Sequence, residues 1–238
     1  MAATGRGAIR SIEQPNGFAS ANGLDVVVQH GSASELHGRP LISDRAVLEL
    51  IEVDGPAIVL GSAQRSVLVH NRVEAEVVRR RGGGGAVWVG PTDGVWFDIT
   101  IPRDDDRWVQ DVGVAFGWLG DALELWLRPW LIDVQVVATV HRGGLRAGPY
   151  SDLICFAGAG PGELFVDDRK LVGISQRRTR EASRFMCWMP TVWSAALLVE
   201  ALVDRSRTIE AMEAVGEAGV GLIDLGIDAA AVKRELIA

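Results

Sequence analysis

Short apolar runs separated by turn residues dominate the first hundred positions of the chain. Residues rich in valine, isoleucine and leucine occupy 24–29, 46–53 and 57–60, and a further apolar run covers 95–101. Runs of this length and composition predict β-strands. The Asp-Gly-Pro sequence at 54–56 favours a tight turn, so the strands on either side of it are expected to pair as a hairpin.

The clearest helical pattern follows at 104–127. Apolar residues recur there at spacings of three and four, behind an acidic start. This periodicity predicts an amphipathic helix, with the acidic residues beside the positive end of its dipole and Pro129 at its end. Four tryptophans on or just past this pattern are assigned to core packing: Trp108, Trp118, Trp126 and Trp130.

The second half of the chain contains patterns of both kinds. Strands are expected at 134–140, 153–157, 164–166 and 170–176, and helices at 191–204 and from 209 to the end. A tight turn is expected at 167–170. Because strands and helices mix without strict β-α alternation, the pattern favours an α+β fold with a mixed or antiparallel sheet flanked by helices.

Composition narrows the class of protein. The chain has 238 residues, of which 48% are hydrophobic and 23% charged, and a net charge of -7. We expect a flexible segment at 1–22, one main domain at 23–205 and a short helical appendage at 206–238. The acidic balance argues against nucleic-acid binding, and no apolar run reaches the ~18 residues of a membrane helix. Since the start also lacks the apolar core of a signal peptide, a cytoplasmic protein without membrane contact is expected.

Cysteine and histidine usage points to neither disulfides nor structural metal. Cys155 and Cys187 are expected to be free thiols, because intracellular chains keep such pairs reduced. The four histidines stand far apart, with no pair at helical ligand spacing. No structural zinc site is therefore expected.

One segment combines positive charge with residues that lack side chains. Three arginines at 79–81 directly precede four glycines at 82–85. Guanidinium groups bind phosphate or carboxylate through a planar fork of donors, and consecutive glycines let backbone N–H groups approach a ligand. The segment therefore predicts an anion site. The alternative is a flexible basic surface loop, since neither the phosphate-loop nor the dinucleotide-binding spacing is present.

Two motifs of this chain together resemble a known family. The first is formed by Arg79, Arg80, Gly83, Gly84, Gly85, Ala86 and Val87, and the second by Lys170, Gly173 and Ser175. With the Ser-Asp-Leu sequence at 151–153 between them, they resemble the lipoate-protein ligase A family, within the biotin and lipoate ligase superfamily. The resemblance extends over roughly 47–204, and it implies the superfamily's catalytic domain, similar to class II synthetases, over 23–205.

The resemblance implies a two-step reaction. Lipoate or a related medium-chain acid is activated with ATP to an acyl-adenylate, and the acyl group then passes to a lysine. The implied partner is the lipoyl carrier domain of a 2-oxoacid dehydrogenase or a glycine-cleavage H-type protein, and Mg²⁺ is implied through the nucleotide. Because the tail at 206–238 is too short for the family's C-terminal closing domain, a small accessory protein is a further implied partner.

The resemblance also assigns roles to single residues. Lys170 would be the catalytic cation, contacting the carboxyl oxygen and the phosphate; its alternative is a solvated turn lysine. Binding of the acyl-adenylate and ATP would fall to Arg80, Arg81, Gly83, Gly84, Gly85, Ala86, Val87, Trp88, Asp93, Asp152, Gly173 and Ser175. Asp93 would otherwise begin a turn, and Asp152 would cap one. We expect Lys170→Ala to stop the chemistry and leave the thermal midpoint nearly unchanged.

The chain departs from the family pattern in ways that make the pocket less polar. Gly82 replaces a serine, Val89 and Gly90 replace a His-Asp pair, and Met-Cys-Trp-Met at 186–189 replaces a His-Gly pair. Two alternatives therefore stay open. One is a transferase that takes an acyl group from a carrier thioester through Cys187, and the other is a catalytically weak homologue that binds acyl or nucleotide ligands. Both cysteines also fit small buried apolar residues.

Overall fold

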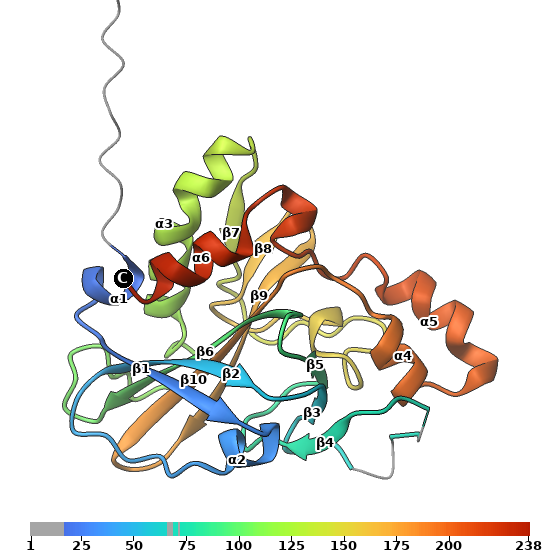
Figure 1. The fold of residues 1–238 in the computed structure, drawn as a ribbon, viewed down its shortest axis with the longest axis horizontal. Helices are drawn as coiled ribbons and strands as arrows, with labels where there is room; N and C mark the ends of the chain where they lie inside the picture. Colours follow the sequence, from blue (N-terminus) through green and yellow to red (C-terminus); the bar gives the residue numbers. More distant parts are fainter. Residues whose placement is uncertain (1–16, 66–68, 71) are drawn as a thin grey trace, which may run out of the picture.

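Two β-sheets and their flanking helices make up the computed structural model, which describes residues 17–65, 69–70 and 72–238 (Figure 1). Most of the segment predicted to be flexible, residues 1–16, lies outside the described residues. The rest of that segment contains helix α1 (Phe18–Ala21), whose Phe18 ring packs edge-on against Trp126 at 5.3 Å.

The larger sheet has seven strands in the order β1-β2-β6-β10-β9-β8-β7. Its strands are β1 (Asp25–Gly31), β2 (Val47–Val53), β6 (Gly94–Pro102), β7 (Ala138–Val140), β8 (Leu164–Val166), β9 (Arg169–Arg178) and β10 (Ala182–Pro190). β1 pairs with β2 in parallel, and the other pairs are antiparallel. The predicted α+β class with a mixed sheet is confirmed.

The smaller sheet has the order β4-β3-β5 and consists of β3 (Ala57–Leu60), β4 (Glu76–Arg79) and β5 (Val87–Val89). The predicted hairpin across 54–56 is wrong, because β2 and β3 belong to different sheets. Both edges of β2 are already occupied, by β1 on one side and β6 on the other. The turn at 54–56 therefore carries the chain from one sheet to the next.

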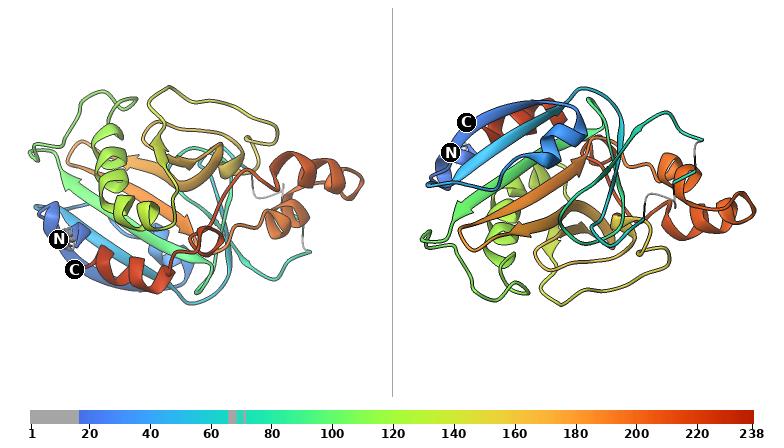
Figure 2. Two further views of the ribbon diagram at one scale, coloured as in Figure 1. Left: turned by 90° about the horizontal axis from the view of Figure 1, so that it is seen from above. Right: turned by 90° about the horizontal axis from the view of Figure 1, so that it is seen from below.

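Helices α3 (Gly117–Asp133) and α6 (Ala229–Leu236) cover one face of the large sheet (Figure 2). Helix α2 (Ala33–Gly38) lies on the opposite side, next to β4. Helices α4 (Ala196–Leu202) and α5 (Thr208–Val215) pack together beside the small sheet. The described residues also contain three short 3-10 turns: Cys155–Ala157, Arg205–Arg207 and Ile223–Leu225.

The helix predicted at 104–127 is displaced in the structure. It begins at Gly117 and continues past Pro129 to Asp133. The preceding residues form turns, in which the Asp105 carboxylate accepts hydrogen bonds from the side chain and backbone of Arg107. Pro129 has no N–H group, so the carbonyl of Leu125, four residues earlier, lacks its helical hydrogen bond. Because Leu125 is exposed, water can solvate this carbonyl and the helix continues.

The helical shift also changes nearby predictions. Because α3 extends to Asp133, the strand expected at 134–140 is reduced to β7. The segment 153–157 forms a 3-10 turn and not a strand. Trp126 is core, as predicted, but Trp108 lies outside the helix, with the Arg178 guanidinium 3.9 Å from its ring centre.

The two faces of the large sheet differ in chemistry. Strand register places Phe97, Ile99 and Phe185 on the face beneath α3 and α6, in the main hydrophobic core. The neighbouring residues Trp96 and Trp188 point to the other face, toward the small sheet. The space between the two sheets is where the motifs of the sequence meet.

Candidate active site

The glycine segment forms a loop that packs closely against two other parts of the backbone. A Cβ atom on Gly85 would lie 2.7 Å from the Cys155 nitrogen, which is too close. A Cβ atom on Gly61 would overlap the Gly84 carbonyl oxygen. Gly84 has a φ of +93°, which side-chain-bearing residues rarely adopt. Ala86 continues the loop into a bridge with Ile154. Close backbone packing thus explains why several of these positions lack side chains.

Arg80 holds this loop in place from the inside. Its guanidinium donates hydrogen bonds to the carbonyls of Val59 at 3.1 Å, Gly83 at 2.6 Å and Gly85 at 2.8 Å, and to the Ser175 hydroxyl at 3.3 Å. The side chain is almost completely buried, and this burial lowers the pKa of Arg80 from its ordinary value. Its four acceptors carry no charge, so these hydrogen bonds do not neutralise the guanidinium.

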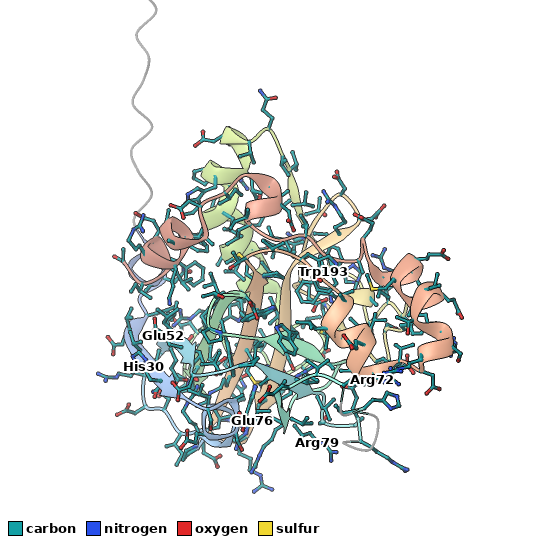
Figure 3. All side chains as sticks on the ribbon, turned by 45° about the vertical axis from the view of Figure 1, so that its right-hand side comes forward. His30, Glu52, Arg72, Glu76, Arg79 and Trp193 are labelled. Atoms are coloured by element: carbon teal, nitrogen blue, oxygen red, sulfur yellow. The ribbon has the colours of Figure 1, made fainter. Side chains whose placement is uncertain are left out.

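The three arginines of the motif do not converge. Arg80 is buried, whereas Arg79 and Arg81 are exposed. Figure 3 shows Arg79 at the outer end of the small sheet. Arg81 is not among the residues that line the cavities described below. The anion site predicted from this segment therefore draws its positive side chain from Arg80 alone.

The loop leaves part of its backbone unused. Among the described residues, the N–H groups of Gly83, Gly84 and Gly85 donate no hydrogen bond. Free N–H groups on consecutive glycines are suited to binding an anion. The anion site expected from the sequence stays a prediction.

Lys170 is a buried lysine at the start of β9, with 1% of its side chain exposed. Its ammonium forms an ion pair with the Glu163 carboxylate at 2.7 Å and donates a hydrogen bond to the Cys155 carbonyl at 2.8 Å. The rings of Phe156 and Phe165 lie within 6 Å of the nitrogen. Lys170 is therefore not a solvated turn lysine.

Glu163 is held as firmly as its partner. One carboxylate oxygen accepts a hydrogen bond from the Gly160 N–H at 2.6 Å, and the other from the Ile174 N–H at 3.2 Å. A buried pair of this kind needs such additional hydrogen bonds to offset the loss of hydration. An anionic ligand must compete with Glu163 for the Lys170 ammonium.

The glycine loop and Lys170 meet at one cavity of about 600 Å³, which we call the lysine cavity. Gly83, Gly84 and Gly85 line one side, and Lys170 and Glu163 another. Asp152 and Ser175 also reach it. The two motifs, far apart in sequence, therefore face the same space.

Two further cavities adjoin the lysine cavity. The apolar cavity, of about 40 Å³, lies between the two sheets and shares Cys155, Ile174 and Ser175 with the lysine cavity. Its other lining residues are His37, Val59, Arg80, Val87, Val89, Trp96, Phe156, Gly173, Met186, Cys187 and Trp188. The tryptophan cavity, of about 260 Å³, shares three residues with the apolar cavity: Val87, Phe156 and Trp188.

Trp88 and Asp93 line the tryptophan cavity together. The Trp88 indole donates a hydrogen bond of 2.6 Å to the Asp93 carboxylate. Asp93 also closes a turn through its backbone, by donating to the Gly90 carbonyl. Trp193 stacks on Phe156 at 4.7 Å in the same cavity, on the side of α4 and α5 (Figure 3).

The described residues contain no group of three or more histidine, cysteine, aspartate or glutamate side chains that could hold a metal ion. Asp93 is engaged by Trp88, and Asp152 is exposed. No helix of the described residues is long and apolar enough to cross a membrane.

The two cysteines are both free and lie in different surroundings. Cys187 is buried with 1% exposure, and burial raises the pKa of its thiol well above the ordinary value. Cys155 is partly exposed and lines both the lysine cavity and the apolar cavity, and Arg80 also lines the apolar cavity. The structure therefore favours Cys155 over Cys187 as an accessible thiol.

Sequence reasoning missed several residues of this site. Glu163, Cys155 and His37 carried no motif that distinguishes them from surface or core residues. Strand β10 was also missed, although all nine of its residues are buried and its Phe-Met-Cys-Trp-Met run could have indicated a central strand. Its position between β6 and β9 places Met186 and Trp188 in the cavity wall.

The fold and the site define a class of protein: an α+β domain with a glycine loop and a buried lysine around a shared cavity. The family model of the lipoyl protein ligase A/B catalytic domain matches residues 39–224. The chain belongs to this family.

Solved structures show the same fold at low sequence identity. A bipartite lipoate protein ligase from Thermoplasma acidophilum, studied with its E2 lipoyl domain, is 14% identical with a TM-score of 0.65, covering 90% of this chain and 80% of that one. A lipoate-protein ligase A bound with ATP is 16% identical with a TM-score of 0.63, covering 90% and 82%. No curated protein matches the chain in sequence.

Proposed function

We propose that this protein is an ATP-dependent ligase that activates lipoate or a related medium-chain acid and transfers the acyl group to a lysine of a lipoyl carrier domain. The observation that carries the proposal is the meeting of the glycine loop and Lys170 at the lysine cavity. Two similar structures support the ligands: one contains ATP, and the other was studied with its lipoyl domain.

In the first step, a carboxylate oxygen of the acid attacks the α-phosphorus of ATP, and pyrophosphate leaves. Both reactants are anions, so they must be brought together by positive charge and by backbone donors set in place beforehand. The N–H groups of residues 83–85 provide the donors, and Arg80 keeps the loop in shape. Lys170 would exchange its contact with Glu163 for the reacting oxygens. Mg²⁺ would neutralise charge on the phosphates.

In the second step, the amine of the carrier lysine attacks the acyl carbonyl, AMP leaves, and the amine loses a proton. The carrier lysine must reach the cavity from outside. Asp152, Gly144 and Leu145 all line the cavity and are exposed. Leu145 is 90% exposed, so it offers apolar surface to a carrier domain.

The proposal is tested by ATP-pyrophosphate exchange with lipoate, octanoate and biotin. Exchange with lipoate or octanoate is expected, and Lys170→Met should reduce it by about a thousandfold. Because the variant removes a buried charge, its folding has to be checked by circular dichroism. Wild-type protein that shows no exchange with any of the acids would refute the ligase, and binding of acid or nucleotide without exchange would indicate a binding protein.

A second candidate function, acyl transfer from a carrier thioester, is favoured by the position of Cys155. In this reaction the Cys155 thiolate attacks the thioester carbonyl, the donor thiol leaves with a proton, and the carrier lysine then displaces Cys155. Mass spectrometry after incubation with an acyl-carrier donor should find the acyl group on Cys155. Cys155→Ala should abolish the adduct and Cys187→Ala should retain it; the reverse would refute this assignment.

A further inference from the structure

The apolar cavity runs across the strands of the large sheet from β9 to β6. Strand register aligns Gly173 of β9 with Trp188 of β10, and Trp188 with Trp96 of β6. These three residues line the cavity and are spread over two interstrand spacings, about 10 Å. Cys155 and Ser175 lie at the β9 end, shared with the lysine cavity. The β6 end is the far end from the reacting groups.

His37 stands at this far end. It belongs to α2, whose start is fixed by a capping box between Ser32 and Glu35. The imidazole ring lies against the Trp96 indole at 4.8 Å between ring centres. Its Nε2 atom is buried and has no hydrogen-bond partner among the described residues.

The surroundings keep this imidazole neutral. Burial, followed by the positive charges of Arg80, Arg39 and Arg184, lowers the pKa of His37 to about 3. A neutral imidazole nitrogen either donates or accepts a hydrogen bond, depending on the tautomer. The ring can thus meet a hydroxyl or another uncharged polar group without a counterion.

An unpaired buried nitrogen is costly, at roughly the free energy of a hydrogen bond. Apart from Arg80, the cavity is lined mainly by apolar residues, and no polar group of the described residues satisfies this nitrogen. A ligand that ends in a methyl group would leave the nitrogen unpaired. One that ends in a hydrogen-bonding group would satisfy it.

We propose that His37 forms a hydrogen bond with the end of the acyl chain remote from the carboxyl group. The preferred substrate is then a medium-chain acid with a hydrogen-bonding group at that end. This inference rests on the proposed function, in that it takes the apolar cavity as the acyl-chain site. The cavity measures about 40 Å³, so a medium-chain acyl group must displace side chains from its wall. Met186, with its flexible side chain, forms part of that wall.

The test compares octanoic acid with 8-hydroxyoctanoic acid, each as the free acid and as its N-acetylcysteamine thioester. Binding to the full chain is followed by isothermal titration and by the fluorescence of Trp96 and Trp188, which line the cavity. The wild type should bind the hydroxylated chain about tenfold more tightly than the plain one. His37→Phe should remove this preference, and His37→Asn, which keeps a hydrogen-bonding group, should retain part of it. His30→Phe, at an exposed histidine paired with Glu52, is the control and should bind like the wild type.

Equal affinities for the two chains, no binding of either, or a preference that survives in His37→Phe would overturn the inference. Thermal unfolding of each variant shows whether the fold is kept, and His37→Asn still decides the question if His37→Phe fails to fold. ATP-pyrophosphate exchange is measured on the same samples. A preference that depends on His37 without exchange would support the inference and count against the ligase. Exchange without the preference would support the ligase and count against the inference.

Discussion

Arg80 and Lys170 are both buried cations beside the same group of cavities, but they are stabilised in different ways. Arg80 donates to three backbone carbonyls and a hydroxyl, all uncharged. Lys170 has a carboxylate partner, Glu163. Four of the five guanidinium donors are thus engaged by neutral acceptors while the Arg80 charge remains. The Lys170 charge is instead balanced by one carboxylate contact that a ligand can replace. The comparison indicates that Arg80 builds the site, and under the proposed function Lys170 acts in it.

The largest effect is expected from Lys170→Ala. Removal of one partner from a buried ion pair leaves the other charge unpaired and costs about 4 kcal/mol. This differs from the expectation based on sequence, in which the lysine was not yet known to be buried. Chemical denaturation of the variant measures the loss.

A double variant makes this comparison sharper. Lys170→Met combined with Glu163→Gln removes both charges and should recover most of the stability but none of the activity. If the double variant is as unstable as Lys170→Ala, the unpaired charge of Glu163 is not the cause.

Arg80→Lys should cost about 3 kcal/mol of unfolding free energy. A lysine cannot replace the planar fork that reaches the carbonyls of Gly83 and Gly85, so buried acceptors are left unpaired. Arg81→Lys is the matched control, because Arg81 is exposed, and it should change stability by less than about 0.5 kcal/mol. Similar losses in both variants would show that Arg80 does not brace the loop.

Stability should also depend on the ionisation of His37. Its folded pKa is about 3, below the ordinary value of 6.5, so between these values the unfolded chain binds the proton more strongly and stability falls as the pH falls. From pH 6.5 to pH 5 this amounts to about 2 kcal/mol. Burial raises the pKa of Asp98 to about 6, which acts in the opposite direction.

Comparison with a variant separates the two groups. His37→Phe should lose the contribution of the histidine and keep that of Asp98. Denaturation curves of both proteins at pH 5 and pH 7 provide the measurement, and identical pH dependence would exclude His37 as the cause.

The smallest effect concerns the glycine loop itself. Gly84→Ala places a side chain at φ +93° and 3.0 Å from the Arg80 guanidinium, and should cost about 1 kcal/mol or more. Gly83→Ala is the matched control, because a Cβ there meets nothing within 4 Å. Thermal unfolding should separate the two variants. Equal midpoints would indicate that the loop adapts freely and that Arg80 does not fix its conformation.

Local patterns predicted much of the fold. The β-branched runs at β2, β3 and β6 and the strand at β9 lie where the alternation of apolar residues and turns indicated. The helix at 104–127 was displaced because its acidic start folds into local turns around Asp105 and Arg107. Arg107 also donates to the Asn22 carbonyl, and a tertiary contact of this kind overrides periodicity. Strand β10 was missed because a run buried on both faces shows no alternation.

The sequence by itself determined the family, since the order and spacing of the arginine-glycine and lysine-glycine-serine motifs are local properties of the chain. Tertiary structure decided how these motifs are used: that Glu163 balances Lys170, that Arg80 braces the loop, and that His37 faces the apolar cavity. The physical reason is that each of these relations depends on which strands pair and in what register. Pairing of strands far apart in the chain is set by the burial of whole faces, and no single segment specifies it.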